Sequence, residues 1–230
     1  MADAARTPCE QKGRLPYSRL VQFLCPSPGR LFQRLVIESN ARTGLDIGCG
    51  EHSLLSPLRG PLFRTTGVDS SLERLETARR HNLHDEYIHA DFTRMALNRT
   101  FDVVVLNNVI EHFPREQGLR VLAAVESMDP RLILIQTPNG FLEQPAGKDD
   151  PHQRHLSGWF PHDFEGRGYT VFGIGVKWLR GPWGRARRLP EALVRLVARG
   201  LRWYHFRRPH KAFEIAAIRF VDEEGNLRQL

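Results

Sequence analysis

The stretch Gly44-Leu45-Asp46-Ile47-Gly48-Cys49-Gly50-Glu51-His52-Ser53 determines how we interpret the rest of this chain. Its first residues are mostly apolar, as in a buried strand that ends near Asp46, and a tight Gly-Cys-Gly turn follows. Residues 53–55 are expected to open a helix. Glycines let the backbone pass close to a ligand, and the free N–H groups at a helix start favour a polar or anionic group. The stretch therefore predicts a strand, turn and helix around a ligand, an arrangement that many nucleotide-binding folds share.

Two acidic residues narrow this interpretation. Asp46 lies two residues before the first glycine, where dinucleotide-binding sites usually keep an apolar residue and where a carboxylate could hold an ammonium group. Asp69 ends the next predicted strand, residues 65–68, at about the distance expected of an acid that binds a ribose.

These residues resemble the signature of the class I S-adenosyl-L-methionine-dependent methyltransferases, although His52 stands at the position of the family's usual third glycine. The resemblance implies that Asp46 supports the loop and the amino-acid end of the cofactor, and that Asp69 binds the ribose hydroxyls. Four further cofactor-binding positions are implied: Gly48, Cys49, Gly50 and Ser70.

Later segments of the chain also resemble this family. Asp91 and Phe92 follow a short predicted strand and match the adenine site, where the acid accepts from the exocyclic amine and the apolar residue packs on the ring. Asn107 follows a nearly continuous apolar run, residues 101–106, that suits a central parallel strand. In the family, residues just past this strand approach the sulfonium.

The Glu111-His112 pair resembles the small-molecule methyltransferases, including those of quinone biosynthesis. Some quinone-pathway members are thought to use an acid three residues before the glutamate in a metal site. Because Asn108 stands there, we expect no metal. Glu111 and His112 could equally cap and orient the next helix, a purely structural role.

Strands that alternate with helices predict a parallel sheet with right-handed crossovers. The resemblance implies an α/β fold with a seven-stranded, doubly wound, mostly parallel sheet and an antiparallel last strand. Three units are expected: an N-terminal helical cap at 1–40, a methyltransferase domain at 41–222 with a basic helical insertion at about 181–211, and a C-terminal tail at 223–230. Single helices are predicted at residues 156–168 and 190–206.

Composition limits the setting of the protein. The chain has 230 residues, of which 41% are hydrophobic, and it contains no apolar run of about 18 residues that could span a membrane. The N-terminus lacks the apolar core of a signal peptide, and three cysteines without metal spacing suggest a reduced, cytoplasmic protein.

The net charge of +7 is concentrated in the last third of the chain. Residues 167–211 hold twelve Lys and Arg, and Glu191 is the only acid among them. Such a field attracts phosphate, nucleic acid or an anionic membrane surface. The helix at 190–206 could lie on a membrane, which would make the protein peripheral at the inner membrane face, or it could cover its own domain as a lid.

The predicted function is methyl transfer from S-adenosyl-L-methionine to a small-molecule, lipid-linked or glycan-type acceptor, by O- or N-methylation. A general base helps when the acceptor is a hydroxyl, and three residues are the candidates: His155, His112 and Glu111. Two alternatives are a nucleic-acid-modifying methyltransferase and an NAD-dependent oxidoreductase. The first usually carries an Asn/Asp-Pro-Pro-aromatic motif, which residues 107–110 do not match, and the second gives no account of residues 107–112.

Overall fold

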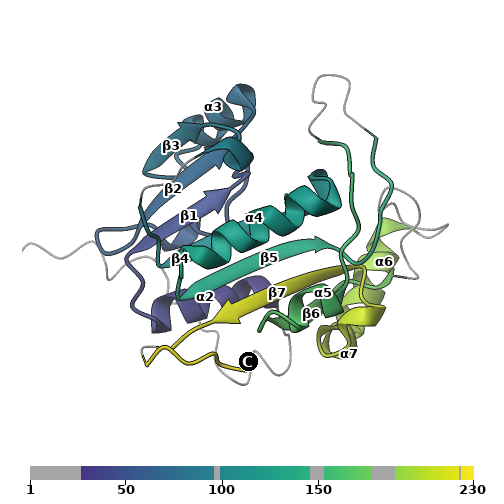
Figure 1. Ribbon diagram of the computed structural model, residues 1–230. Helices are drawn as coiled ribbons and strands as arrows, with labels where there is room; N and C mark the ends of the chain where they lie inside the picture. The colour runs from purple at the N-terminus through teal and green to yellow at the C-terminus, as the bar shows by residue number, and fades with distance from the viewer. Residues whose placement is uncertain (1–26, 96–98, 146–152, 178–189, 223) are drawn as a thin grey trace, which may run out of the picture.

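Seven strands form one sheet in the order β3-β2-β1-β4-β5-β7-β6 (Figure 1). They are β1 (Thr43–Ile47), β2 (Arg64–Asp69), β3 (Glu86–His89), β4 (Val103–Asn107), β5 (Leu132–Pro138), β6 (Thr170–Ile174) and β7 (Glu214–Phe220). Both neighbours of β7 pair with it antiparallel, and all other neighbouring strands pair in parallel. This computed structural model therefore confirms the predicted sheet and its antiparallel last strand.

The structure describes residues 27–95, 99–145, 153–177, 190–222 and 224–230. Its α-helices are α2 (Pro28–Glu38), α3 (Leu72–Arg80), α4 (Arg115–Ser127), α5 (Pro161–Glu165), α6 (Glu191–Gly200) and α7 (Arg202–Phe206). The 3-10 helices within these ranges are η2 (Ser56–Leu58), η3 (Phe92–Arg94), η4 (Ile110–His112) and η8 (Pro209–Lys211). Within these ranges, no helix is long and apolar enough to cross a membrane.

Helices cover both faces of the sheet, which explains why β4 and β5 are apolar along almost their whole length. On one face, Val121 of α4 and Phe164 of α5 belong to the same buried cluster as Val104 of β4. On the other face, Phe32 of α2 and Phe206 of α7 belong to the cluster of Val103. The described part of the predicted N-terminal cap, α2, thus packs on the sheet, and residues 1–26 lie outside the described ranges.

Local residues explain where two of the helices begin. The Ser71 Oγ accepts a hydrogen bond of 3.4 Å from the Arg74 N–H and caps α3. Pro114 immediately precedes α4, where its missing N–H costs no helical hydrogen bond.

Three predicted helices differ in the structure. Residues 53–55 do not open an α-helix but lead into the short η2, because Pro57 lacks the N–H that a longer helix would use. Only Pro161–Glu165 is helical within 156–168, since a residue before proline disfavours the helical conformation. The helix at 190–206 is two helices that meet at Leu201, directly after Gly200, a poor helix former. The basic insertion is described only in part, because residues 178–189 lie outside the described ranges.

Candidate active site

The glycine loop, Gly48 to Gly50, directly follows the carboxyl end of β1. Gly48 and Gly50 have φ angles of 65° and 47°, in the left-handed region that favours glycine. A Cβ at Gly48 would lie 2.5 Å from the Val109 Cγ2, so any side chain there would clash. The N–H groups of Gly48 and Cys49 both donate to the Val68 carbonyl, at 2.7 and 3.1 Å. The loop is therefore fixed to the end of β2.

Asp46 supports this loop from below. Its Oδ2 accepts a hydrogen bond of 2.5 Å from the Ser53 Oγ, and the Ser53 Oγ accepts in turn from the Leu55 N–H. Burial, partly opposed by the Ser53 hydrogen bond, raises the pKa of Asp46 to about 7. The His84 Nε2 lies 3.6 Å away, but burial, followed by the Arg59 charge, lowers the pKa of His84 to about 4, so this contact is not an ion pair at neutral pH. Asp46 thus supports the loop and lines neither of the cavities described below.

Asp69 sits at the end of β2 with its carboxylate between two backbone donors. Its Oδ2 accepts from the Gly50 N–H at 2.9 Å, and its Oδ1 accepts from the Ser71 N–H at 2.8 Å. A carboxylate oxygen has two lone pairs, so each oxygen keeps one for a ligand hydroxyl. Asp69 and Ser70 both line the first cavity, which is the position expected of ribose-binding residues.

The first cavity has a volume of about 560 Å³ and extends from Asp69 to Asp91 and Phe92. The Asp91 Oδ1 accepts from the Thr93 N–H and Thr93 Oγ1, at 2.9 and 2.7 Å, which fixes the carboxylate at the start of η3. The buried Phe92 ring adds an apolar wall. An acid at each end and an apolar surface between them are what a ribose joined to a flat base requires.

Cys49 is a predicted cofactor residue whose side chain has another environment. Its side chain is buried in a small cluster with Leu75 and Ala78 of α3. Burial, followed by the charges of Asp46 and Asp69, raises the pKa of the thiol, which makes it unreactive. As part of the glycine loop, Cys49 also lines the second cavity, which is described below.

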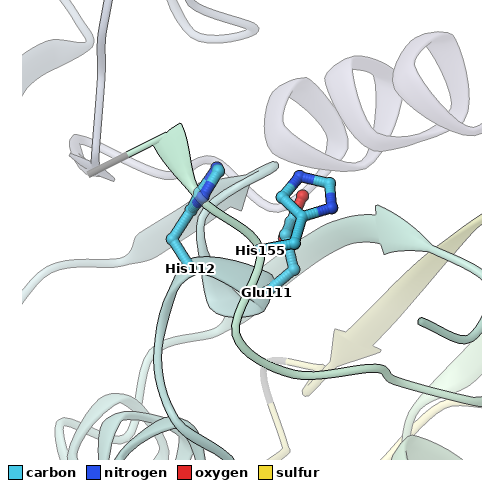
Figure 2. Close-up of side chains that lie close together, drawn as sticks. All are labelled: Glu111, His112 and His155. Carbon is cyan, nitrogen blue, oxygen red and sulfur yellow. The ribbon is translucent and has the colours of Figure 1, made fainter. Parts of the chain in front are cut away.

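Glu111, His112 and His155 lie together at the carboxyl end of the sheet (Figure 2). Each residue has one nitrogen or carboxylate oxygen that could ligate a metal ion, and these three atoms lie within 4.8 Å of one another, although His155 is distant in sequence. The backbone explains this approach, because the Glu111 carbonyl accepts hydrogen bonds from the N–H groups of Leu156 and Ser157 at 2.8 and 3.1 Å. The structure thus brings together all three residues that the sequence predicts as catalytic.

The Glu111 carboxyl is almost fully buried, with 2% of its surface exposed. Its pKa is raised to about 8, chiefly by burial and to a lesser extent by the charge of Glu214, while hydrogen bonds from its own backbone N–H and from the Thr137 Oγ1 oppose the rise. The carboxyl is therefore mostly protonated at neutral pH, so it does not serve as an ion-pair partner there.

Backbone carbonyls fix the tautomers of the two histidines. The His112 Nδ1 lies 3.1 Å from the Arg154 carbonyl, and the His155 Nδ1 lies 2.7 Å from the Leu142 carbonyl. A carbonyl only accepts, so each Nδ1 carries the proton, and the His155 Nε2 keeps a lone pair that can accept one. Burial lowers the pKa of His155 despite its carbonyl partner, which keeps that ring neutral at pH 7. His155 can therefore take up a proton at Nε2.

The second cavity has a volume of about 630 Å³ and adjoins the first. Its lining includes His155 and Glu214, and it shares with the first cavity the residues Gly48, Arg74, Asn108, His112 and Gln153. Asn107 also lines it, and its buried Oδ1 has no hydrogen-bond partner among the described residues. A ligand with a donor group at this point would satisfy that oxygen.

The donor set of the cluster also fits a divalent cation. Two histidine nitrogens and one carboxylate suit zinc or manganese, and the Nδ1 hydrogen bonds to carbonyls are typical of metal-binding histidines. The prediction of no metal rests on Asn108, which stands where the resemblance would place an acid. It stays a prediction.

Two residues of the site were missed in the sequence. Thr137 holds the Glu111 carboxyl at 3.0 Å, and Glu214 faces the second cavity. Glu214 starts the antiparallel β7 and pairs with Pro138, the last residue of β5. An antiparallel last strand puts its first residue, rather than its last, at the ligand edge, and that signal could have identified Glu214.

A family model described as a methyltransferase domain matches residues 15–174. The ubiquinone biosynthesis O-methyltransferase of Rickettsia canadensis is 30% identical over 95 residues, which cover 40% of this chain and 40% of that protein. The trans-aconitate 2-methyltransferase of Azoarcus sp. is 31% identical over 119 residues, 50% of this chain and 44% of that protein. The chain thus spans less than half the length of these two curated relatives.

Two solved structures have a similar fold. The plantazolicin methyltransferase BpumL, in complex with SAH, is 20% identical with a TM-score of 0.51, and the match covers 86% of this chain and 83% of that one. A SAM-dependent methyltransferase from Archaeoglobus fulgidus is 17% identical with a TM-score of 0.50, over 86% of this chain and 96% of that one.

Proposed function

Because the chain belongs to the methyltransferase-domain family of S-adenosylmethionine-dependent enzymes, we propose that it transfers the cofactor's methyl group to a hydroxyl of a small molecule bound in the second cavity. The observation that carries this proposal is the junction of the two cavities at Gly48, Asn108 and His112. A cofactor in the first cavity would present its sulfonium at this junction, beside the cluster of Glu111, His112 and His155.

The polar groups of the first cavity support the orientation of the cofactor. Free lone pairs on Asp69 suit the two ribose hydroxyls, and Asp91 with Phe92 suits the amine and the flat face of adenine. The unpaired Asn107 Oδ1 lies in the second cavity, beside the glycine loop, and suits the ammonium group of the methionine part, which would extend there from the first cavity. Asp46 acts one step away by holding the loop through Ser53.

The chemistry then needs alignment and removal of one proton. The sulfonium supplies a reactive methyl group and a good leaving group. With the cofactor bound, an acceptor oxygen held in the second cavity opposite the sulfur would take the methyl group as the carbon–sulfur bond breaks, and the demethylated cofactor would be the leaving group. The neutral His155 Nε2 takes the hydroxyl proton during this step, since its Nδ1–H is held by the Leu142 carbonyl.

The acceptor is expected to be small and polar at the reacting end. The second cavity of about 630 Å³ has the size of ordinary small-molecule sites. Glu214 and His112 line this cavity beside His155, so an acceptor that carries more than one polar group would find hydrogen-bonding side chains there. The name of one curated relative, a ubiquinone biosynthesis O-methyltransferase, supports transfer to an oxygen.

A second mechanism uses the same cluster differently. If Glu111, His112 and His155 hold a divalent cation, the cation would lower the pKa of a bound acceptor hydroxyl, and no histidine base would be needed. The oxidoreductase alternative is set aside by the family membership.

Calorimetry with S-adenosylhomocysteine and with NAD tests which class of cofactor the protein binds. We expect the methionine-derived ligand to bind and to raise the melting temperature with concentration, since it binds only the native state. A mass-spectrometric screen of hydroxylated small molecules with S-adenosylmethionine then identifies the acceptor. Tight binding of NAD without binding of S-adenosylhomocysteine would contradict the proposed function.

A further inference from the structure

The helices α6 and α7 and the short η8 form a strongly basic surface beside the second cavity. Five exposed residues define this basic helical surface: Arg199, Arg202, Arg207, Arg208 and Lys211. None of the five makes an ion pair with an acid among the described residues. Glu191 is the only acid in residues 190–213, so the field of this surface is not neutralised locally.

Large apolar side chains are exposed on the same helices. Leu193, Leu196 and Trp203 leave 42%, 67% and 47% of their surface exposed. The opposite side is anchored, because Phe206 is buried and stacks on Phe172 of β6 with 4.5 Å between ring centroids. The helices are therefore fixed to the domain by one side and present leucine, tryptophan and arginine to their surroundings on another.

This surface is connected to the second cavity. The Asn139 Nδ2 donates to the carbonyls of Pro209 and Ala212, at 2.9 and 2.8 Å, and so ties η8 to the end of β5. The next two residues, Phe213 and Glu214, line the second cavity. In Figure 1, α6 and α7 lie at the end of the sheet where β5 ends and β7 begins.

We propose that the basic helical surface binds the surface of an anionic lipid bilayer and holds the mouth of the second cavity at the membrane. Arginine and lysine supply attraction to anionic headgroups, and the exposed leucines and tryptophan enter the interface between headgroups and acyl chains. Exposed leucines favour lipid over nucleic acid, since a phosphate backbone offers them no apolar partner. Binding to the bilayer does not depend on the proposed methyl transfer.

Sedimentation with vesicles tests the inference on the full chain. We expect the protein to bind vesicles of phosphatidylcholine that contain phosphatidylglycerol and not vesicles of phosphatidylcholine alone. High salt should release it, because exposed charges are screened over about 8 Å at physiological ionic strength. Arg199→Glu with Arg202→Glu should lower the partition coefficient by at least about 25-fold, since one basic residue near an anionic surface contributes about fivefold.

Matched variants separate this surface from net charge. Arg42→Glu with Arg80→Glu makes the same charge change at exposed positions elsewhere and should leave vesicle binding close to the parent. Leu193→Ser with Leu196→Ser keeps the charge and should weaken binding to anionic vesicles. Circular dichroism and S-adenosylhomocysteine affinity show whether each variant is folded.

Three results would overturn the inference. The first is that the parent does not bind anionic vesicles. The second is that the folded Arg199→Glu, Arg202→Glu variant binds them as well as the parent does. The third is that the Arg42→Glu, Arg80→Glu control loses as much binding as that variant. Tight binding of a single-stranded RNA oligonucleotide by a parent that does not bind vesicles would assign the basic helical surface to nucleic acid.

Discussion

The Thr137 Oγ1 donates a hydrogen bond of 3.0 Å to the Glu111 Oε2, and both side chains are buried. The bond fixes the carboxyl close to His112 and His155 without supplying a positive charge. One neutral hydrogen bond offsets only part of the cost of burying a carboxylate, which is why the pKa of Glu111 rises to about 8.

The stability of the protein should depend on pH through this group. Glu111 has a pKa of about 8 in the folded protein and an ordinary value of 4.5, so the folded state binds more protons between these values and stability falls as pH rises through them. Glu111→Gln removes the dependence. In urea unfolding with a chelator present, the free energy of unfolding of the variant should rise relative to that of the parent by about 1 kcal/mol per pH unit between pH 5 and 8.

Two further variants check the cause of that shift. Glu214→Gln removes the neighbouring charge, so the fall in stability should move to lower pH. Glu38→Gln, at an exposed ion pair with Arg34, should change stability by no more than about 1 kcal/mol at any pH. A difference between parent and Glu111→Gln that stays constant with pH would refute the assignment.

His155 should be required for turnover and not for cofactor binding. His155→Ala removes the Nε2 lone pair, and loss of a general base lowers rates by roughly a hundredfold. Affinity for S-adenosylhomocysteine should hardly change, because the ribose and adenine groups lie in the first cavity. Single-turnover kinetics with the identified acceptor measure the first quantity and calorimetry the second. Full activity of the variant would reduce His155 to a loop residue.

Metal removal distinguishes the two mechanisms of the cluster. With His155 as base, we expect turnover to survive treatment with a chelator and to decline at low pH as the histidine becomes protonated. Loss of turnover after chelation, restored by manganese or magnesium and not restored in His112→Gln, would instead assign the cluster to a divalent cation.

Asp69→Ala should weaken cofactor binding strongly. The change removes both ribose acceptors and leaves the Gly50 N–H without its partner, at a cost of roughly 1–3 kcal/mol, or about 5- to 150-fold in Kd. Isothermal titration with S-adenosylhomocysteine measures it. Glu76→Ala, on the exposed side of α3, is the control and should bind like the parent. An unchanged Kd in Asp69→Ala would exclude Asp69 from the site.

Local signals in the sequence were sufficient for most of the sheet and for the cofactor half. The apolar runs of β4 and β5, the Ser71 cap and the acids at strand ends depend on neighbouring residues, so they can be predicted from them. The approach of His155 to Glu111 could be suspected from the long loop, but no local signal predicts it. It depends on hydrogen bonds between the Glu111 carbonyl and the backbone of residues 156 and 157, which are remote in sequence.

Backbone breaks were harder to predict than burial. The apolar spacing of 190–206 continues across Gly200, yet the helix is interrupted at Leu201, directly after this poor helix former. The role of Thr137 could not be predicted from its neighbours in sequence. Its hydroxyl donates a hydrogen bond to Glu111, which lies in the connection between β4 and α4.

The reversed direction of β7 makes the acceptor half of the protein exchangeable. Because Glu214 pairs with Pro138, the segment from 139 to 213 begins and ends at one place on the sheet, and it carries the edge strand β6, which pairs with β7. A graft with ends so close together inserts without stretching the sheet, and apart from Gln153 and Leu156 it takes nothing from the first cavity. Replacement of this segment by that of another family member should therefore transfer the donor's choice of acceptor to this chain while its affinity for S-adenosylmethionine stays its own.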